Sequence, residues 1–128
     1  MSARSLLAVA LAGLSLSGCQ FTGGGDNSAA ISDAAYLLSK QMAETIGRCW
    51  FAEGETAFAG YQYSPERNAG QSRILIVKKD DPTGLPALVI DATSGSSANV
   101  YGPLATSPNG PRIRADVERW ARGGTSCA

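Results

Sequence analysis

Three cysteines carry the most specific chemistry in this 128-residue sequence: Cys19, Cys49 and Cys127. A thiol can be acylated, can bind a metal or can form a disulfide, and it becomes a strong nucleophile where its pKa is lowered. The sequence contains no histidine, which is the usual general base near neutral pH and the most common metal ligand. Ser-His-Asp and Cys-His catalysis and histidine-containing zinc sites are therefore excluded within this chain.

Two pairs of acidic residues are further candidates for a metal site or for acid–base chemistry. Asp80 and Asp81 lie beside Gly84, but they lack the alternating ligands and the closing glutamate of a calcium-binding loop. Glu53 and Glu55 alternate with small residues, whereas a glycosidase holds two carboxylates about 5–10 Å apart across a cleft. We interpret the aspartates as part of a charged loop, and we expect no catalytic residue, metal or cofactor.

A predicted C-terminal helix carries a cluster of four basic residues: Arg112, Arg114, Arg119 and Arg122. These arginines indicate either a solvated helix face or a site for an anionic partner, such as lipid headgroups, lipopolysaccharide or a protein carboxylate. Within the cluster, Glu118 lies four residues from Arg114 and from Arg122, so these side chains can form a ladder of ion pairs on the helix surface.

Aromatic residues supply a second candidate surface. Tyr61, Tyr63 and Tyr101 fall in predicted strands, and they would form a partner-binding patch if those strands expose them on the free face of a sheet. Trp50 and Trp120 lie next to apolar helix faces, so we expect them in or near the core rather than in a binding surface.

The start of the chain has the pattern of an export signal. Arg4 precedes a mostly apolar run at residues 6–16, which is shorter than the ~20 residues of a membrane-spanning helix. The run ends in a leucine, two small residues and a cysteine, Leu16-Ser17-Gly18-Cys19. This segment resembles the lipobox of bacterial lipoproteins. An ordinary signal peptide followed by a chance cysteine is the alternative.

The resemblance implies cleavage before Cys19, a diacylglycerol on its sulfur and often a third acyl chain on its amine. Two or three acyl chains hold a protein at a bilayer almost permanently, whereas one chain binds marginally. Gln20 stands where lipoproteins kept at the inner membrane often have aspartate. The resemblance therefore favours the outer membrane, with the domain in the periplasm.

We expect three segments: a signal peptide at residues 1–18, a lipidated cysteine and flexible tether at 19–30, and one domain at 31–128. Three consecutive glycines within residues 21–28 are typical of a flexible linker. They do not resemble a phosphate-binding loop, because no strand precedes them and no Gly-Lys-Ser/Thr follows.

The domain should begin with a helix near Ile31 that ends near Gly47. Its apolar residues recur at helical spacing: Ile31, Ala35, Leu38, Met42, Thr45 and Cys49. A second helix should start at Pro111 and end at Gly123–Gly124, with one apolar face: Ile113, Val117, Trp120 and Ala121.

Short apolar runs between the two helices predict strands at residues 57–63, 74–77 and 87–90, with a fourth at 99–104. The polar, turn-rich segment 79–84 predicts an antiparallel connection between the second and third strands. The order of helix, three or four strands, and helix predicts an α+β fold, in which both helices pack on one face of an antiparallel sheet.

With lipid on Cys19, the other two cysteines, Cys49 and Cys127, most simply form a disulfide in an exported protein. They lack the Cys-X-X-Cys spacing of a redox site. A distant redox pair and free or intermolecular thiols are the alternatives.

Basic and acidic residues balance at 11 each, unlike the basic footprint of a nucleic-acid-binding protein. We therefore expect a non-enzymatic envelope module, held in the bilayer by the Cys19 acyl chains, that binds another envelope protein or component. A lipoprotein that binds a small molecule between sheet and helices is the second hypothesis, and an enzyme with a site assembled from distant residues is the third.

Overall fold

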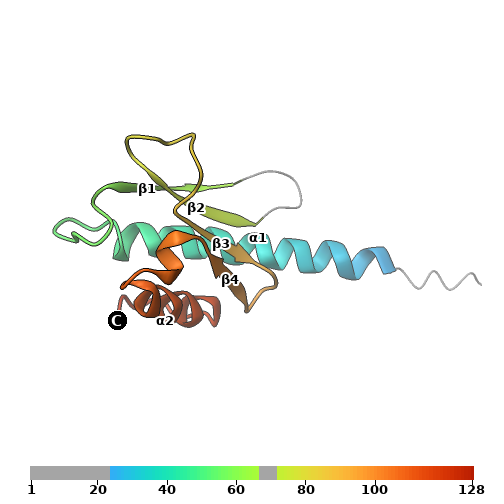
Figure 1. The fold of residues 1–128 in the computed structure, drawn as a ribbon. Coiled ribbons are helices and arrows are strands. Elements are labelled where there is room, and N and C mark those ends of the chain that lie inside the picture. Colours follow the sequence, from blue (N-terminus) through green and yellow to red (C-terminus); the bar gives the residue numbers. More distant parts are fainter. Residues whose placement is uncertain (1–23, 67–71) are drawn as a thin grey trace, which may run out of the picture.

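The computed structural model describes the backbone of residues 24–66 and 72–128, and the side chains of residues 33–66 and 72–128. The signal peptide and the lipobox therefore lie outside the described residues. The elements follow in the order α1 (Gly24–Cys49), β1 (Tyr61–Pro65), β2 (Arg73–Lys78), β3 (Leu88–Ala92), β4 (Ala98–Tyr101), the short 3-10 helix η1 (Pro103–Thr106) and α2 (Gly110–Ala121) (Figure 1). This arrangement confirms the predicted α+β fold, with four strands.

The four strands form one antiparallel sheet in the order β1-β2-β3-β4. The register pairs Ile74 with Ile90, and Ile90 with Val100, and directly paired residues share a face of the sheet. That face is covered by α1 and α2 (Figure 1), and its central isoleucines are almost completely buried.

The core lies between this face and the two helices. Leu88 from the sheet, Met42 and Ile46 from α1, and Ile113 and Val117 from α2 are each at most 1% exposed. Two buried tryptophans, Trp50 and Trp120, complete one end of the core, with ring centroids 5.2 Å apart. The predicted core packing of both tryptophans is confirmed.

Helix α1 buries the face that the periodicity predicted, but its bounds differ from the prediction. It begins at Gly24 rather than near Ile31, so residues 24–30 of the expected tether are helical. Extending a formed helix costs far less than nucleating one, and Ala29 and Ala30 are strong helix formers. The helix also continues past Gly47 to Cys49. Gly47 is a site of close packing rather than a helix end, since the hydroxyl of Tyr63 fills the space that a Cβ there would need.

Two of the predicted strands are shifted, and local turns explain both shifts. Residues 57–60 form a turn in which Tyr61 donates its N–H to the carbonyl of Phe58, so β1 starts four residues later than expected. The fourth strand stops at Tyr101, because Gly102 adopts φ 114° and turns the chain into η1. A Cβ on Gly102 would lie 2.8 Å from the carbonyl oxygen of Ala87, so only glycine fits there.

The predicted disulfide between Cys49 and Cys127 is present, with Cα atoms 5.2 Å apart and a sequence separation of 78. It fastens the C-terminal tail to the end of α1. Arg48 donates to the carbonyl of Thr125 at 2.8 Å, and the Trp120 indole N–H donates to that of Ser126 at 2.8 Å. Among the helices of residues 24–66 and 72–128, none is long and apolar enough to cross a bilayer.

Candidate functional site

Arg112 and Arg119, two of the four arginines of the predicted cluster, form ion pairs with acidic residues of the domain. Arg112 reaches both carboxylate oxygens of Glu55, at 3.4 and 3.1 Å. The hydrogen bond from Arg112 is the largest cause that holds the pKa of Glu55 below its ordinary value, and the same pairing raises the pKa of Arg112. This ion pair ties the start of α2 to the segment that follows α1.

Asp116 lies at the centre of this network and is only 4% exposed. Its carboxylate accepts hydrogen bonds from the indole N–H of Trp50 at 2.9 Å and from Arg119 at 2.6 Å. The guanidinium of Arg119 also lies 5.8 Å from the centre of the Trp120 ring. Nothing in the sequence distinguishes Asp116 as buried, because an acidic residue in a helix is usually solvated.

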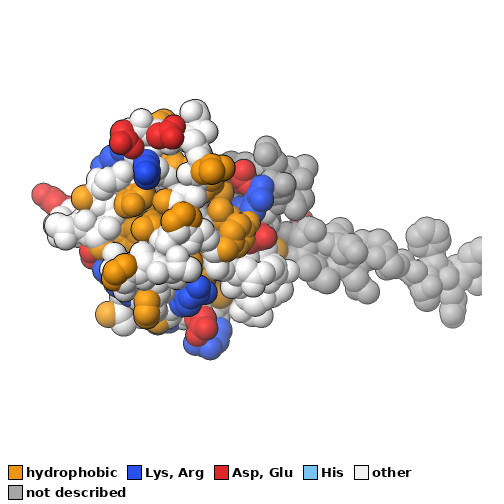
Figure 2. All heavy atoms as spheres, viewed as in Figure 1, with side chains coloured by type: hydrophobic (Ala, Val, Ile, Leu, Met, Phe, Trp, Pro, Cys, Tyr) orange, Lys and Arg blue, Asp and Glu red, His pale blue; other side chains and the backbone are white. Residues whose placement is uncertain are grey.

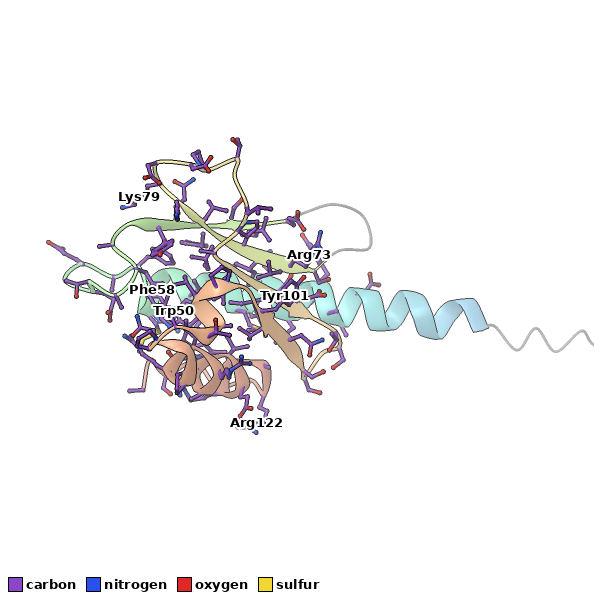
Figure 3. All side chains as sticks on the ribbon, viewed as in Figure 1. Trp50, Phe58, Arg73, Lys79, Tyr101 and Arg122 are labelled. Carbon is purple, nitrogen blue, oxygen red and sulfur yellow. A yellow bond between two sulfur atoms is a disulfide. The ribbon has the colours of Figure 1, made fainter. Side chains whose placement is uncertain are left out.

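The remaining two arginines, Arg114 on α2 and Arg122 directly after its last residue, are exposed (Figure 3). Arg114 donates to the carbonyl of Ala105 at 3.3 Å. The expected ladder is not formed, since within the described part of the chain no ion pair joins Glu118 to either arginine. The charges of Arg114 and Glu118 are therefore open to solvent.

The tyrosines do not form the aromatic patch that the sequence suggested. Tyr63 pairs with Ile76 in the register, so Tyr63 and Tyr61 point to the face that α1 covers. The Tyr63 ring lies 5.1 Å from that of Phe51, and Tyr61 packs against the core. Only Tyr101 lies on the opposite, uncovered face, where it is 46% exposed.

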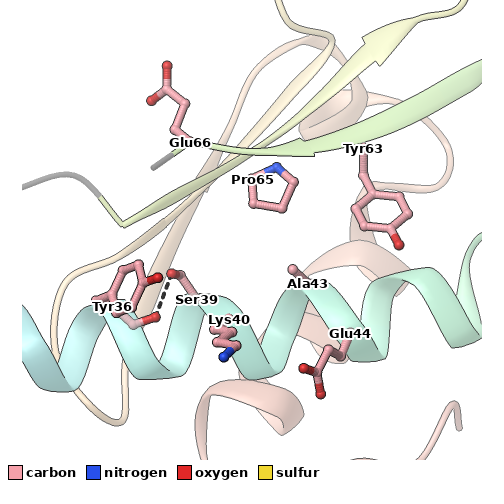
Figure 4. Close-up of a pocket in the computed structure, with 8 residues that line it drawn as sticks. All are labelled: Tyr36, Ser39, Lys40, Ala43, Glu44, Tyr63, Pro65 and Glu66. Atoms are coloured by element: carbon pink, nitrogen blue, oxygen red, sulfur yellow. Dashed lines mark hydrogen bonds between the residues drawn. The ribbon is translucent and has the colours of Figure 1, made fainter. Parts of the chain in front are cut away.

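One surface hollow lies between α1 and the edge strand β1 and has a volume of about 190 Å³ (Figure 4). It is lined by Tyr36, Ser39, Lys40, Ala43, Glu44, Tyr63, Pro65 and Glu66. The hydroxyl of Ser39 is already bonded to the carbonyl of Tyr36 at 2.8 Å. The hollow is smaller than the roughly 300–1,000 Å³ of typical small-molecule sites.

A second hollow lies between the opposite edge strand, β4, and α2, with a volume of about 480 Å³. It is lined by Ala98, Asn99, Val100, Tyr101, Arg114, Val117 and Glu118. Sequence reasoning missed this groove, because the residues of its two walls are far apart in the chain. It unites two features that the sequence did flag separately, the exposed Arg114 and Tyr101.

The acidic pairs are not brought together into a larger cluster. Asp80 and Asp81 are exposed in the β2–β3 connection, and Glu55 is occupied by Arg112, whereas Glu53 is exposed. Within residues 33–66 and 72–128, no three or more cysteine, aspartate or glutamate side chains are grouped so that they could hold a metal ion.

The lipidation residue, Cys19, lies outside the described residues, so the lipobox stands on sequence alone. Comparison of the chain with models of protein families finds no match, and comparisons with curated proteins and with solved structures find none either. The function must therefore be inferred from the residues and geometry of this chain.

Proposed function

We propose that the chain is a lipid-anchored protein of the bacterial envelope, whose α+β domain binds another envelope protein and catalyses no reaction. The anchor rests on the lipobox pattern at residues 16–19, which implies acyl chains on Cys19. Gln20 favours the outer membrane, with the domain in the periplasm.

The geometry of α1 suits an anchored domain. The helix starts at Gly24, five positions after Cys19, and its 26 residues span about 39 Å at 1.5 Å per residue. Its first part extends beyond the sheet, and its last residue, Cys49, is fastened to the C-terminal tail (Figure 1). The helix would therefore connect the lipid to the body of the domain as a semi-rigid spacer.

The observation that carries the binding function is the uncovered face of the sheet. The register places Leu75, Val89 and Tyr101 in one row across this face. Val89 at the centre is only 8% exposed, whereas Leu75 is half-buried and Tyr101 is 46% exposed. Hydrophobic side chains gather near the centre of the sheet side of the molecule (Figure 2). An exposed apolar patch with polar surroundings is typical of a surface that binds another protein.

Mass spectrometry of the full chain from native membranes, with and without crosslinking in cells, tests this proposal. We expect acyl chains on Cys19 and crosslinks from the uncovered sheet face to one defined envelope protein. A Cys19→Ser variant should leave the membrane fraction and lose those crosslinks. An unmodified Cys19 in the wild type would overturn the anchor.

A small-molecule-binding lipoprotein is the second candidate, and the hollow between α1 and β1 is the observation that favours it. Tyr36, Tyr63, Lys40 and Glu44 line this hollow and offer aromatic and charged groups to a ligand (Figure 4). The protein-binding function is preferred because this hollow is small. An acylated chain that captures no protein, but carries a bound small molecule, would reverse this preference.

A further inference from the structure

The two edge strands differ in the backbone groups that they leave unpaired. In an antiparallel ladder, successive residues direct their N–H and C=O groups alternately to one neighbour and the other. Ala92 donates to the carbonyl of Ser72, next to β2, whereas Thr93 donates to that of Ser97, next to β4. The alternation therefore directs the backbone N–H and C=O groups of Asn99 and Tyr101 toward β3. The same groups of Ala98 and Val100 point away from the sheet.

The other edge, β1, offers less to an incoming strand. Glu66 donates its N–H to the carbonyl of Arg73, and Lys79 donates to that of Gly60. By the same alternation, the backbone groups of Tyr61, Tyr63 and Pro65 point away from β2, toward the open edge. Pro65 has no N–H, and the N–H of Tyr61 is bonded to Phe58. Only Tyr63 therefore keeps a donor on this edge, and an edge proline is a common protection against strand addition.

The free groups of β4 lie beside the groove that α2 forms. The half-buried Val100 and the buried Val117 supply apolar side chains to this groove, and Arg114 and Glu118 supply exposed charges. Arg114 bonds to Ala105 in η1, directly after β4, so it marks the C-terminal end of the strand. Glu118 lies one helical turn further along α2 and lines the same groove as Ala98.

We propose that β4 binds an extended segment of a partner protein as a fifth, antiparallel strand that lies along α2. Two donors and two acceptors at strand spacing require an extended backbone, which supplies the complementary set. The partner residues opposite Ala98 and Val100 point toward α2 and are apolar. An acidic residue of the partner lies toward Arg114, and a basic residue lies toward Glu118.

The same arrangement argues against a second copy of this chain as the occupant. Helix α2 packs next to β4, and two domains that paired through β4 would bring their α2 helices into the same space. Packed helices need about 8–10 Å between their axes, whereas neighbouring strands are only about 4.8 Å apart. The proposal rests on the protein-binding function but not on the lipid anchor.

A defined peptide tests the proposal on the full chain in detergent micelles. The probe is a blocked heptapeptide with glutamate first, lysine last, valine third and fifth, and threonine at the other positions. Its third and fifth residues would pair with Val100 and Ala98. We expect peptide titration to shift the amide NMR signals of Ala98 and Val100 and to slow their hydrogen exchange, while Tyr63 in β1 is unchanged.

Two matched pairs of controls isolate the backbone bonds. N-methylation of the third and fifth peptide residues removes donors to β4 and should weaken binding about tenfold or more. N-methylation of the second and fourth residues, whose N–H groups point away, should weaken it much less. In the protein, Val100→Pro removes an outward donor and should weaken binding, whereas Val100→Thr keeps that donor and the side-chain shape. Circular dichroism verifies that both variants are folded.

Three results would overturn the proposal. The first is the absence of any change at Ala98 and Val100 at millimolar peptide, and the second is an equal effect of the two methylation patterns. The third is protection of these amides by the concentrated chain alone, which would make a second copy the occupant. None of these results bears on acylation of Cys19, so the failure of this inference and the failure of the proposed anchor are distinguishable.

Discussion

At the scale of single residues, buried polar groups in this domain are tolerated because they pair with each other. Asp116 lies within the apolar face of α2, between Ile113 and Trp120, and accepts bonds from Trp50 and Arg119. In the side chains that the structure describes, no buried nitrogen or oxygen lacks a hydrogen-bond partner. Such pairing matters because an unsatisfied buried group costs more than a formed hydrogen bond contributes.

Removal of the Asp116 carboxylate should therefore destabilise the domain strongly. We expect Asp116→Ala to lower the free energy of unfolding by about 3 kcal/mol, because the Trp50 N–H loses its acceptor and Arg119 loses its partner. Urea unfolding followed by tryptophan fluorescence measures the change. Glu118→Ala, at an exposed site of the same helix, should stay within about 0.5 kcal/mol of the wild type. Equal effects of the two substitutions would contradict the assigned role of Asp116.

The ion pair between Glu55 and Arg112 should make stability depend on pH in a defined direction. The folded-state pKa of Glu55 lies below its ordinary value of 4.5. Its contribution is therefore complete above the unfolded pKa and is lost as pH falls through the lower folded pKa. The stability difference between wild type and Glu55→Gln should thus be present at neutral pH and vanish in strong acid.

Thermal unfolding at a series of pH values measures the effect of Glu55→Gln. Glu53→Gln, two residues away and exposed, controls for the loss of a negative charge. If the stability difference between wild type and Glu55→Gln grew as the pH fell, the predicted direction of the pH dependence would be wrong.

At the scale of elements, the apolar faces were predictable and the ends were not. The spacing of Leu38, Met42, Ile113 and Val117 identified the buried faces of both helices, because a helix buries a stripe of its surface. The start of β1 depends on a turn at residues 57–60, and the end of β4 depends on Gly102. These turns depend on contacts with residues that are distant in sequence, and the spacing of apolar residues along the chain does not reveal such contacts.

Substitution of Gly102 tests the turn that ends β4. We expect Gly102→Ala to lower the free energy of unfolding by about 2 kcal/mol, because its backbone conformation is open almost only to glycine. The new Cβ would also press on the Ala87 carbonyl. Chemical denaturation quantifies the loss. Gly60→Ala, where a Cβ meets nothing within 4 Å, should change stability far less, and the reverse order would contradict this account.

At the scale of the whole molecule, one covalent bond joins the end of α1 to the C-terminal tail. The disulfide between Cys49 and Cys127 holds the C-terminal tail over the Trp120 end of the core, where Arg48 and Arg119 donate to tail carbonyls. The chain between the two cysteines contains the whole sheet and α2. Closing so long a loop removes much conformational freedom from the unfolded state.

Loss of the disulfide should therefore cost a large part of the stability of this small domain. For 78 residues of separation, the chain-entropy relation gives about 4.5 kcal/mol. We expect Cys127→Ser to lower the free energy of unfolding by roughly this amount, as measured by urea unfolding. Reductant should destabilise the wild type but leave the variant unchanged. A loss below about 1 kcal/mol would show that the tail contributes little to the fold.

The candidate groove shows why residue patterns alone located the site only in part. The sequence flagged Arg114 and Tyr101 as exposed candidates, and both line the hollow beside β4. It also flagged Arg112, Arg119 and Tyr61, which are engaged within the fold. Tyr63 is 37% exposed and contacts the ring of Phe51 on the side of the sheet that α1 covers. Whether an arginine binds a neighbour or faces solvent depends on residues that folding brings near, such as Glu55 and Asp116.

The sequence alone was enough to predict the fold class, the buried helix faces and the pairing of Cys49 with Cys127, and it contains the export pattern that ends at Cys19. These features depend on local spacing, on composition and on the small number of cysteines, which are properties of the chain before it folds. Only the tertiary structure decided which face received Tyr61 and Tyr63, which arginines were paired and which edge of the sheet stayed open. Those outcomes depend on strand register and on helix placement, which are set by contacts between residues far apart in sequence.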